Sequence, residues 1–187
     1  GAEILEETNT QVKVRAGIGG AGEGHVVLVS DSGARVTLEN GWTYNDAGVI
    51  NNVAPATAQI NTVVTIAGSA LLGGGSDIAT ATLGGVEAVV RSAGADQVVF
   101  VAVRPVDAGD ADPNAVVLVS DTGAIVEVTG QFAYVEEGAV TSLVPDVGQI
   151  GTSITIEGTS LFGAGESVVR VTLAGVEADI ETASDTT

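Results

Sequence analysis

Pro55–Gly85 reads PATAQINTVVTIAGSALLGGGSDIATATLGG, and most of this segment returns 90 residues later in the chain. Pro55 recurs as Pro145, and a second block, Val26–Asp31 (VVLVSD), recurs letter for letter as Val116–Asp121. Self-similarity at a fixed spacing is the signature of a repeated structural unit. The spacing therefore predicts units of about 90 residues, a length at which a small sandwich buries its own core.

Within the repeats, apolar and polar residues alternate in the way that half-buried strands require. Val12 and Val14 alternate with Lys13 and Arg15, and the same period of two places Val64 and Ile66 on one face. Turn residues rich in Gly, Ser and Asp separate these runs, and no segment shows a helical period. This pattern predicts an all-β chain of tandem β-sandwich domains.

The spacing also divides the chain into three parts. Residues 1–46 match the C-terminal part of a unit, residues 47–136 form one complete unit, and residues 137–187 match the N-terminal part of a further unit. Ala2–Ile4 resembles Ala178–Ile180, so the chain starts and stops at the same point within the repeat. We expect a segment of a longer repetitive polypeptide.

A series of motifs accompanies the repeat. These are Pro145, Gly148, Gly151-Thr152, Ile154-Thr155-Ile156, Gly158, Leu161, Gly84-Gly85 and Phe132-Ala133-Tyr134. Together they resemble the IPT/TIG family, an immunoglobulin-like (E-set type) β-sandwich module. The first copy departs from the pattern, since Ala58 and Asn61 stand where two glycines fall, a change that affects a loop rather than the core.

The surface charge narrows the classes of partner. The formal net charge is −18, from 24 acidic and 6 basic residues, and such a potential repels phosphate backbones and anionic lipids. No apolar run approaches the roughly 18 residues that span a bilayer. We therefore expect neither nucleic acid as a partner nor direct insertion into a membrane. The chain has no cysteine, so disulfides contribute nothing to the fold.

The resemblance implies a function of a general kind. IPT/TIG modules form stalks of cell-surface receptors and adhesins, repeats of extracellular proteins, and accessory modules of polysaccharide enzymes. We predict a non-catalytic structural or adhesive repeat of an extracellular or cell-surface protein, a stalk or filament building block. Its partners would be neighbouring repeats of its own kind, glycans or other surface proteins. The alternative is a carbohydrate-binding accessory module, which would need an exposed aromatic platform such as Trp42.

The partial units predict uncovered sheet faces. By alternation, Ala79, Ala81 and Leu83 should face inward, and so should their repeat equivalents. The uncovered face of the last part would then carry Ile154, Ile156, Val169, Val171 and Leu173. Leu72 and Phe162 are candidates for contacts between neighbouring units. Two hypotheses remain open: the missing halves are covalently continuous, or the N-terminal part of one molecule completes the C-terminal part of another, head to tail.

One loop carries candidate ligands for a metal. Asp107, Asp110, Asp112 and Asn114 place four oxygen-bearing side chains within eight positions, and hard oxygen ligands are those that Ca²⁺ takes. The spacing differs from that of an EF-hand loop, and a solvated acidic loop is the alternative. No other cofactor is indicated by the sequence.

Three further patterns point away from catalysis. Gly17–Gly22 satisfies Gly-x-Gly-x-x-Gly, but the residues that follow it predict a strand, which offers no helix N-terminus for a pyrophosphate. His25 is the only histidine, and neither a nucleophile nor an orienting acid is marked beside it. Ser30 and Asp31 recur as Ser120 and Asp121, but in a predicted hairpin turn. The sequence therefore predicts no enzymatic activity.

Overall fold

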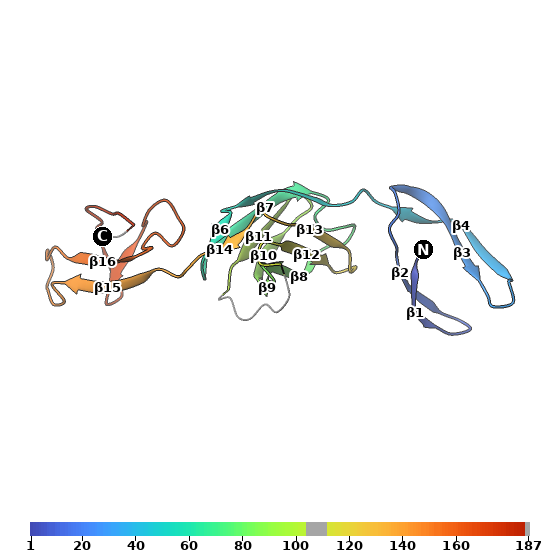
Figure 1. The fold of residues 1–187 in the computed structure, drawn as a ribbon, viewed down its shortest axis with the longest axis horizontal. Coiled ribbons are helices and arrows are strands. Elements are labelled where there is room, and N and C mark those ends of the chain that lie inside the picture. The colour runs from blue at the N-terminus through green and yellow to red at the C-terminus, as the bar shows by residue number, and fades with distance from the viewer. Residues whose placement is uncertain (104–111, 186–187) are drawn as a thin grey trace. The chain divides into compact units, whose positions relative to one another are not determined.

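The computed structural model describes residues 1–103 and 112–185, and every regular element in these ranges is a β-strand. The chain separates into two compact units, Gly1–Ala47 and Gly48–Thr187. The second unit holds one complete sandwich and, after it, four strands of a further repeat (Figure 1). The all-β, immunoglobulin-like prediction is confirmed. Within the described residues there is no helix of the length and apolarity that crossing a bilayer requires.

The first unit consists of two antiparallel hairpins. Strand β1 (Glu3–Glu7) pairs with β2 (Val12–Arg15), and β3 (Gly22–Val29) pairs with β4 (Arg35–Tyr44). A turn at Ser30 closes the second hairpin, where the Ser30 hydroxyl accepts the Ala34 N–H at 3.1 Å. Both hairpins are two-stranded sheets, so neither carries the third and fourth strands of a complete sandwich layer.

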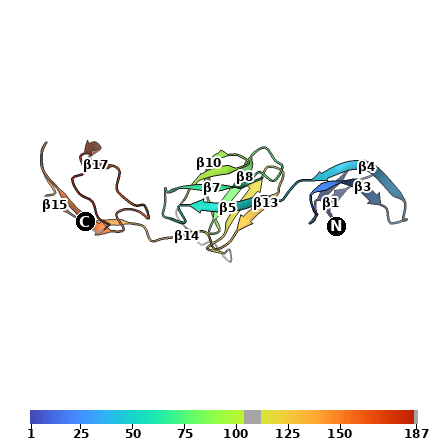
Figure 2. The same cartoon turned by 90° about the horizontal axis from the view of Figure 1, so that it is seen from above.

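The complete sandwich is built from two four-stranded sheets (Figure 2). The first has the order β10-β11-β7-β5, with bounds Val89–Ala93, Gln97–Val101, Val63–Ser69 and Val49–Ala54. The second has the order β13-β12-β8-β9, with bounds Ile125–Val128, Val116–Ser120, Ile78–Leu83 and Val86–Glu87. All neighbouring strands within these sheets are antiparallel.

A short parallel pair joins the beginning of the sandwich to its end. Strand β6 (Thr57–Ala58) lies beside β14 (Ala133–Tyr134) in parallel register. The Ala133 N–H donates to the Ala56 carbonyl at 2.9 Å, and the Val135 N–H donates to the Ala58 carbonyl at 2.9 Å. These bonds tie the segment that follows β5 to the last strand of the same module.

The last four strands repeat the first part of the sandwich. Strand β15 (Ala139–Val144) pairs with β16 (Thr155–Thr159), and β17 (Val171–Leu173) pairs with β18 (Val176–Ala178). The β15–β16 register reproduces that of β5–β7 at a spacing of 90 residues, including the irregularity that follows Val140 in one pair and Ile50 in the other. Gly68 and Gly158 allow this close approach, because a Cβ on either would collide with the carbonyl of Val49 or Ala139.

The core lies between the two sheets of the complete sandwich. Its largest fully buried side chains are Phe100, Ile66, Leu71, Leu83, Leu118, Val64, Val98 and Val116. Apart from Leu71, which lies after β7, they come from alternate positions of β7, β8, β11 and β12, so the predicted inward placement of Val64 and Ile66 is correct. Two phenylalanine rings, Phe100 and Phe132, and many branched aliphatic side chains fill this core, in keeping with the low aromatic content.

The predicted inward placement of Ala79 is wrong. Ala79 is exposed and Ile78 is buried instead, because the β8–β12 register shifts at this point and Ser120 pairs with Ile78. A β-bulge of this kind inserts one extra residue and reverses the inward and outward positions beyond it. Its repeat equivalent Val169 is 89% exposed and lies before β17, and its inward placement stays a prediction.

Removal of a buried side chain should affect the complete sandwich far more than the same change in the first unit. We expect Leu118→Ala to lower the free energy of unfolding of the sandwich by about 2–5 kcal/mol, since it leaves a cavity in a closed core. Leu28→Ala, in the identical sequence VVLVSD, should cost less than about 1 kcal/mol in dilute solution, because Leu28 is already exposed. Hydrogen exchange of the full chain, followed by mass spectrometry, measures both, and equal effects would contradict the assignment of the core.

Candidate interaction surface

The repeated sequence VVLVSD adopts one local structure in two different surroundings. Leu28 pairs with Val36 across β3–β4, as Leu118 pairs with Val126 across β12–β13. Val116 and Leu118 are 0% exposed, whereas Val26 and Leu28 are 36% and 43% exposed. Identical side chains in identical register thus differ in burial because the opposing strands are present in one unit and absent from the other.

The first unit exposes the face that its counterpart buries. The side chains on this face are Val12, Val14, Val26, Leu28 and Val36. They correspond in register to Val98, Phe100, Val116, Leu118 and Val126, which are all buried in the complete sandwich. This face is the one that the complete sandwich covers with its opposing half.

The last four strands expose the opposite half of the same sandwich. Ile154, Ile156, Val171 and Leu173 are only partly buried. Their equivalents Val64, Ile66, Ala81 and Leu83 are 0–1% exposed. Strands β16 and β17 are also shorter than β7 and β8, and each has one neighbouring strand where β7 and β8 have two. The chain therefore carries both a front half and a back half of a sandwich, each with its inner face uncovered.

The two other predicted contact residues differ from each other. Leu72 is partly buried and packs against the core of its own sandwich. Phe162 is partly buried in the last part of the chain, and its N–H donates to the Asp185 carboxylate at 2.9 Å. Leu72 thus has a structural role within its module, and the proposal of a contact between units rests more on Phe162.

The proposed calcium loop lies mainly outside the described residues. Asp107 and Asp110 fall in the range 104–111, of which nothing is described. Asp112 accepts the Asn114 N–H on its Oδ1 atom at 2.8 Å, which is the bond that starts a turn. No group of three or more acidic, histidine or cysteine side chains suited to a metal occurs in residues 1–103 and 112–185. Calcium binding remains a prediction.

The residues considered for catalysis have structural partners. Nδ1 of His25 accepts the Asn40 N–H at 3.0 Å, across the irregular register between Gly24 and Val26. Gly17–Gly22 leads into strand β3, as the sequence predicts. Ser120 binds the Thr122 hydroxyl at 2.8 Å and the Ala124 N–H at 3.2 Å, and Ser30 makes the same pair of bonds to Ser32 and Ala34. These serines close hairpin turns.

A carboxylate joins the two halves of the complete sandwich, and the sequence did not reveal it. Asp121 accepts the Ser76 N–H at 3.1 Å on Oδ1 and the Ser76 hydroxyl at 2.6 Å on Oδ2. These two hydrogen bonds from Ser76 hold the pKa of Asp121 below its ordinary value. Gly75 permits the approach, since a Cβ there would collide with the carboxylate. The recurrence of Asp31 as Asp121 was the available signal, but it indicated only a turn.

An aromatic pair lies at the matching place in each copy of the final strand. Phe132 and Tyr134 meet edge to face with ring centroids 5.1 Å apart, and Trp42 and Tyr44 do so at 5.7 Å. Phe132 is 3% exposed, whereas Trp42 is 49% exposed. Burial raises the pKa of the Tyr134 hydroxyl, and the Val103 backbone acts in the opposite direction. The aromatic pair is a core element when the sandwich is complete.

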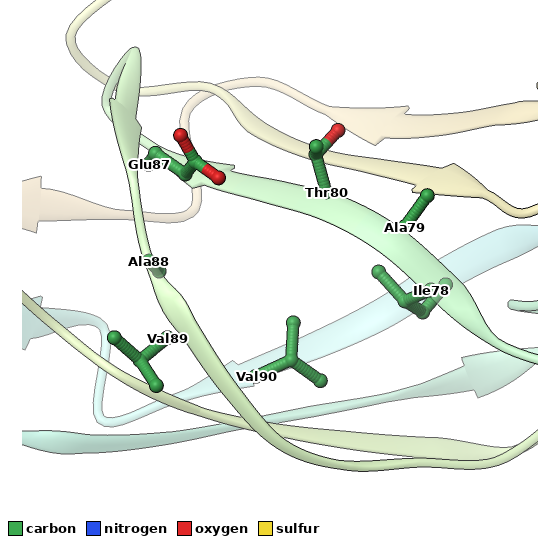
Figure 3. Close-up of a pocket in the computed structure, with 7 residues that line it drawn as sticks. All are labelled: Ile78, Ala79, Thr80, Glu87, Ala88, Val89 and Val90. Atoms are coloured by element: carbon green, nitrogen blue, oxygen red, sulfur yellow. The ribbon is translucent and has the colours of Figure 1, made fainter.

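A shallow depression of about 410 Å³ opens at one edge of the sandwich, where β8 and β9 face β10 (Figure 3). The side chains that line it are Ile78, Ala79, Thr80, Glu87, Ala88, Val89 and Val90. Glu87 supplies one carboxylate and Thr80 one hydroxyl, and the other five are aliphatic. This lining provides no second titratable group within the depression to work with Glu87 in acid–base chemistry.

Comparison with known proteins agrees with the geometry. Two facing antiparallel sheets with this strand order define an immunoglobulin-like sandwich module. The sequence matches the IPT/TIG domain over residues 49–134 and 139–187. The chain belongs to the IPT/TIG domain family, as its motifs predict. No curated protein matches the sequence.

Several solved structures resemble parts of the chain. An auxiliary nutrient binding protein from Bacteroides thetaiotaomicron is 25% identical, with a TM-score of 0.39, over 52% of this chain and 23% of its own. The extracellular region of plexin A4 is 18% identical, with a TM-score of 0.47, over 84% and 18%. A Bacteroides ovatus protein of a mixed-linkage glucan utilization locus, in complex with a heptasaccharide, is 16% identical, with a TM-score of 0.32, over 67% and 31%. The chain thus spans less than a third of each of these proteins.

Neutralising Asp121 should weaken the link between the two halves. We expect Asp121→Asn to lower the melting temperature of the sandwich at pH 7 and to have less effect at pH 3. The folded pKa is depressed, so the stabilisation is present above the ordinary value of 3.8 and is lost as the pH falls through the folded pKa. Asp31→Asn, in the same turn of the first unit, serves as the control. Equal melting-temperature losses at both pH values would show that the charge of Asp121 plays no part.

Proposed function

We propose that the chain is a non-catalytic structural or adhesive repeat of an extracellular or cell-surface protein, acting as a stalk or filament building block. The observation that carries this proposal is the parallel pairing of β6 with β14 near the two ends of one module. Family membership and the repeated 90-residue unit support it. The acidic surface adds mutual repulsion between neighbouring molecules at low ionic strength.

The parallel pair suits a module that transmits tension along the chain. The preceding chain leaves β6 at its N-terminal end, and the following chain leaves β14 at its C-terminal end. Because the two strands run in the same direction, opposite pulls on the chain act along the strands and load their hydrogen bonds together. Antiparallel strands pulled from one shared end would lose their bonds one at a time. Ala58, in β6 itself, is fully buried, and this burial keeps water from the bonds under load.

Self-association is the second part of the proposal. The uncovered faces of the first unit and of the last four strands are opposite halves of one sandwich, so molecules that meet head to tail would cover both. Each buried square ångström of apolar surface contributes about 25 cal/mol. A contact between two different surfaces propagates into a filament or closes into a ring.

Force spectroscopy of the full chain tests the stalk role. The complete module should unfold in one discrete event with a contour-length gain of about 30 nm, at about 3.6 Å per released residue. Ala133→Pro removes the N–H that donates to Ala56 and should lower the unfolding force at an unchanged length gain. Ala133→Ser keeps this N–H and should retain the force. Unfolding without a resolved force peak in the unmodified chain would refute the stalk role.

One observation favours the alternative of a carbohydrate-binding accessory module. Trp42 is half exposed and held edge to face by Tyr44, so a ring face is available to a sugar. If this role holds, a glycan array probed with the chain should give signals that disappear with Trp42→Ala and persist with Val169→Ala, a control at another exposed apolar residue. Signals that survive Trp42→Ala, or none at all, would reject Trp42 as a sugar platform.

A further inference from the structure

We propose that the open edge of β8, between Ile78 and Thr80, binds an extended peptide segment as an added antiparallel strand. A lysine or arginine at the N-terminal end of that segment would lie beside the Glu87 carboxylate. The site belongs entirely to the complete sandwich. The inference goes beyond the stalk role, because it assigns a binding site and the chemistry of its partner.

The first half of β8 has a neighbouring strand on one side only. On that side β8 pairs with β12 along its length. On the other side it pairs with β9 at Thr82 and Leu83, and one further hydrogen bond follows. The Ala88 N–H donates it to the Ala81 carbonyl at 2.9 Å. In the part of the chain that the structure describes, no strand continues this ladder along Ile78–Thr80. Such an edge presents backbone groups that another strand can bind.

The edge is open because the chain leaves this sheet at Ala88. Strand β9 ends at Glu87, and β10 begins at Val89 in the other sheet, where it pairs with β11. Figure 3 shows this segment turning away from β8 after Glu87. An antiparallel strand that continued from the pair of Glu87 with Thr82 would pass beside Ile78–Thr80. The crossover therefore leaves the position of one strand unfilled.

A groove follows this edge between the two sheets. The depression of about 410 Å³ in Figure 3 shares Ile78 and Val90 with another of about 580 Å³, which continues along β10 to Ala93. Ile78 is 7% exposed and Val90 packs against the core, so the floor of the groove is aliphatic. Ala79 and Ala88 line it with short side chains. The groove therefore suits an extended segment with aliphatic side chains on its inner face.

The second strand along this groove, β10, is less suited to pairing with a partner. Strand β10 is the outermost strand of its sheet, and its register with β11 shifts at Arg91. A register shift and a charged side chain are two features by which edge strands avoid unwanted pairing. The edge of β8 has no charged residue within Ile78–Thr80, and its register shift falls in the ladder with β12. We therefore assign the added strand to β8.

A carboxylate beside the open edge favours a basic partner. Among the residues that the structure describes, the Glu87 side chain has no hydrogen bond or ion pair. Its repeat equivalent Glu177 has a partner, since Nε of Arg170 lies 3.7 Å from Oε2 of Glu177. Arg170 stands at the repeat position of Thr80, which carries no charge. A lysine or arginine of a bound segment would supply this charge, and the net charge of −18 also attracts cationic partners.

The position of Glu87 determines where the basic residue stands in the segment. Antiparallel pairing is slightly more stable per residue than parallel pairing. A segment antiparallel to β8 begins next to Ala88, so its first residue lies opposite Thr80 and on the same face of the sheet as Glu87. The other end of the groove is lined by Asp77 and Arg91, whose opposite charges give no net preference. The basic residue therefore belongs at the N-terminal end.

Two synthetic peptides of equal composition test this arrangement on the full chain. The first is acetyl-Lys-Val-Thr-Val-Thr-Gly-amide, and the second, acetyl-Thr-Val-Thr-Val-Lys-Gly-amide, has its lysine at the other end. Fluorescence anisotropy of labelled peptides should give about threefold tighter binding for the first, the size expected of an exposed ion pair. Added salt should reduce this difference, since it screens the pair. Equal affinities, or no measurable binding of the first peptide, would overturn the proposal.

Substitutions in the chain test whether Glu87 recognises the lysine. Glu87→Gln should abolish the threefold difference between the peptides. Thr80→Arg should also abolish it, because it introduces the cation that the next repeat has at this position. Glu127→Gln is the matched control, an equal change of charge at an exposed residue of β13, and it should leave the difference intact. A difference that persists in Glu87→Gln would place the lysine elsewhere and contradict the assignment.

Methylation of the peptide backbone tests strand addition itself. Alternate N–H groups of an antiparallel strand point toward its neighbour. Because the Ala88 N–H bonds to β8, the next N–H in line to do so is that of the first valine. N-methylation of this valine should weaken binding about tenfold, whereas N-methylation of the threonine after it should have little effect. Equal effects at both positions would mean that no ladder forms, and strand addition would be wrong.

Amide chemical shifts of the full chain identify the occupied edge. The first peptide should shift the amide signals of Ile78–Thr80 more than those of Val89–Ala93. Shifts confined to β10, or to strands outside the complete sandwich, would overturn the assignment to β8. If the signals of Ile78–Thr80 moved with protein concentration in the absence of peptide, a second copy would occupy the edge and the peptide assignment would be wrong.

The stalk role and this site can fail separately. A resolved unfolding force in a chain that binds neither peptide would retain the stalk role and overturn the site. Binding that requires Glu87 and the N-terminal lysine, in a chain whose module unfolds without a force peak, would do the reverse.

Discussion

The structure depends on one constraint: each half of the sandwich needs the other half to keep its apolar face from water. The β7–β11 and β8–β12 ladders join these halves, together with the short β6–β14 pair, and they bring together strands that are distant in sequence. Where both ladders exist, the core side chains are fully buried. Where they are missing, the same sequence VVLVSD leaves its valine and leucine side chains in water.

Local structure is less sensitive to this constraint. The hairpins β3–β4 and β12–β13 share one register although only one of them is covered, and the Ser30 and Ser120 turns make the same hydrogen bonds. Short-range turn chemistry is therefore sufficient to set the hairpins. A half sandwich therefore keeps the pairing of its hairpin when the opposing half is missing.

The sequence predicted much of the fold but less of the candidate interaction surface. The period of two and the 90-residue repeat predicted the all-β class and the inward face of β7, and the motifs predicted the family. Alternation failed at Ala79, because a bulge in β8 reverses the inward positions and has no reliable sequence signal. Ser76 and Asp121 were also missed, since residues 45 positions apart meet only when the two halves pack.

The sequence by itself determined the repeat, the strands, their turns and the family, because these rest on side-chain period and on contacts between near neighbours. The tertiary structure alone decided which copy of each strand is covered by an opposing sheet, and that the Asp121 carboxylate accepts a hydrogen bond from the Ser76 hydroxyl. Those outcomes depend on pairing between distant strands. Leu28 and Leu118 lie in identical local sequences, so the sequence around each leucine does not indicate whether a second sheet covers it.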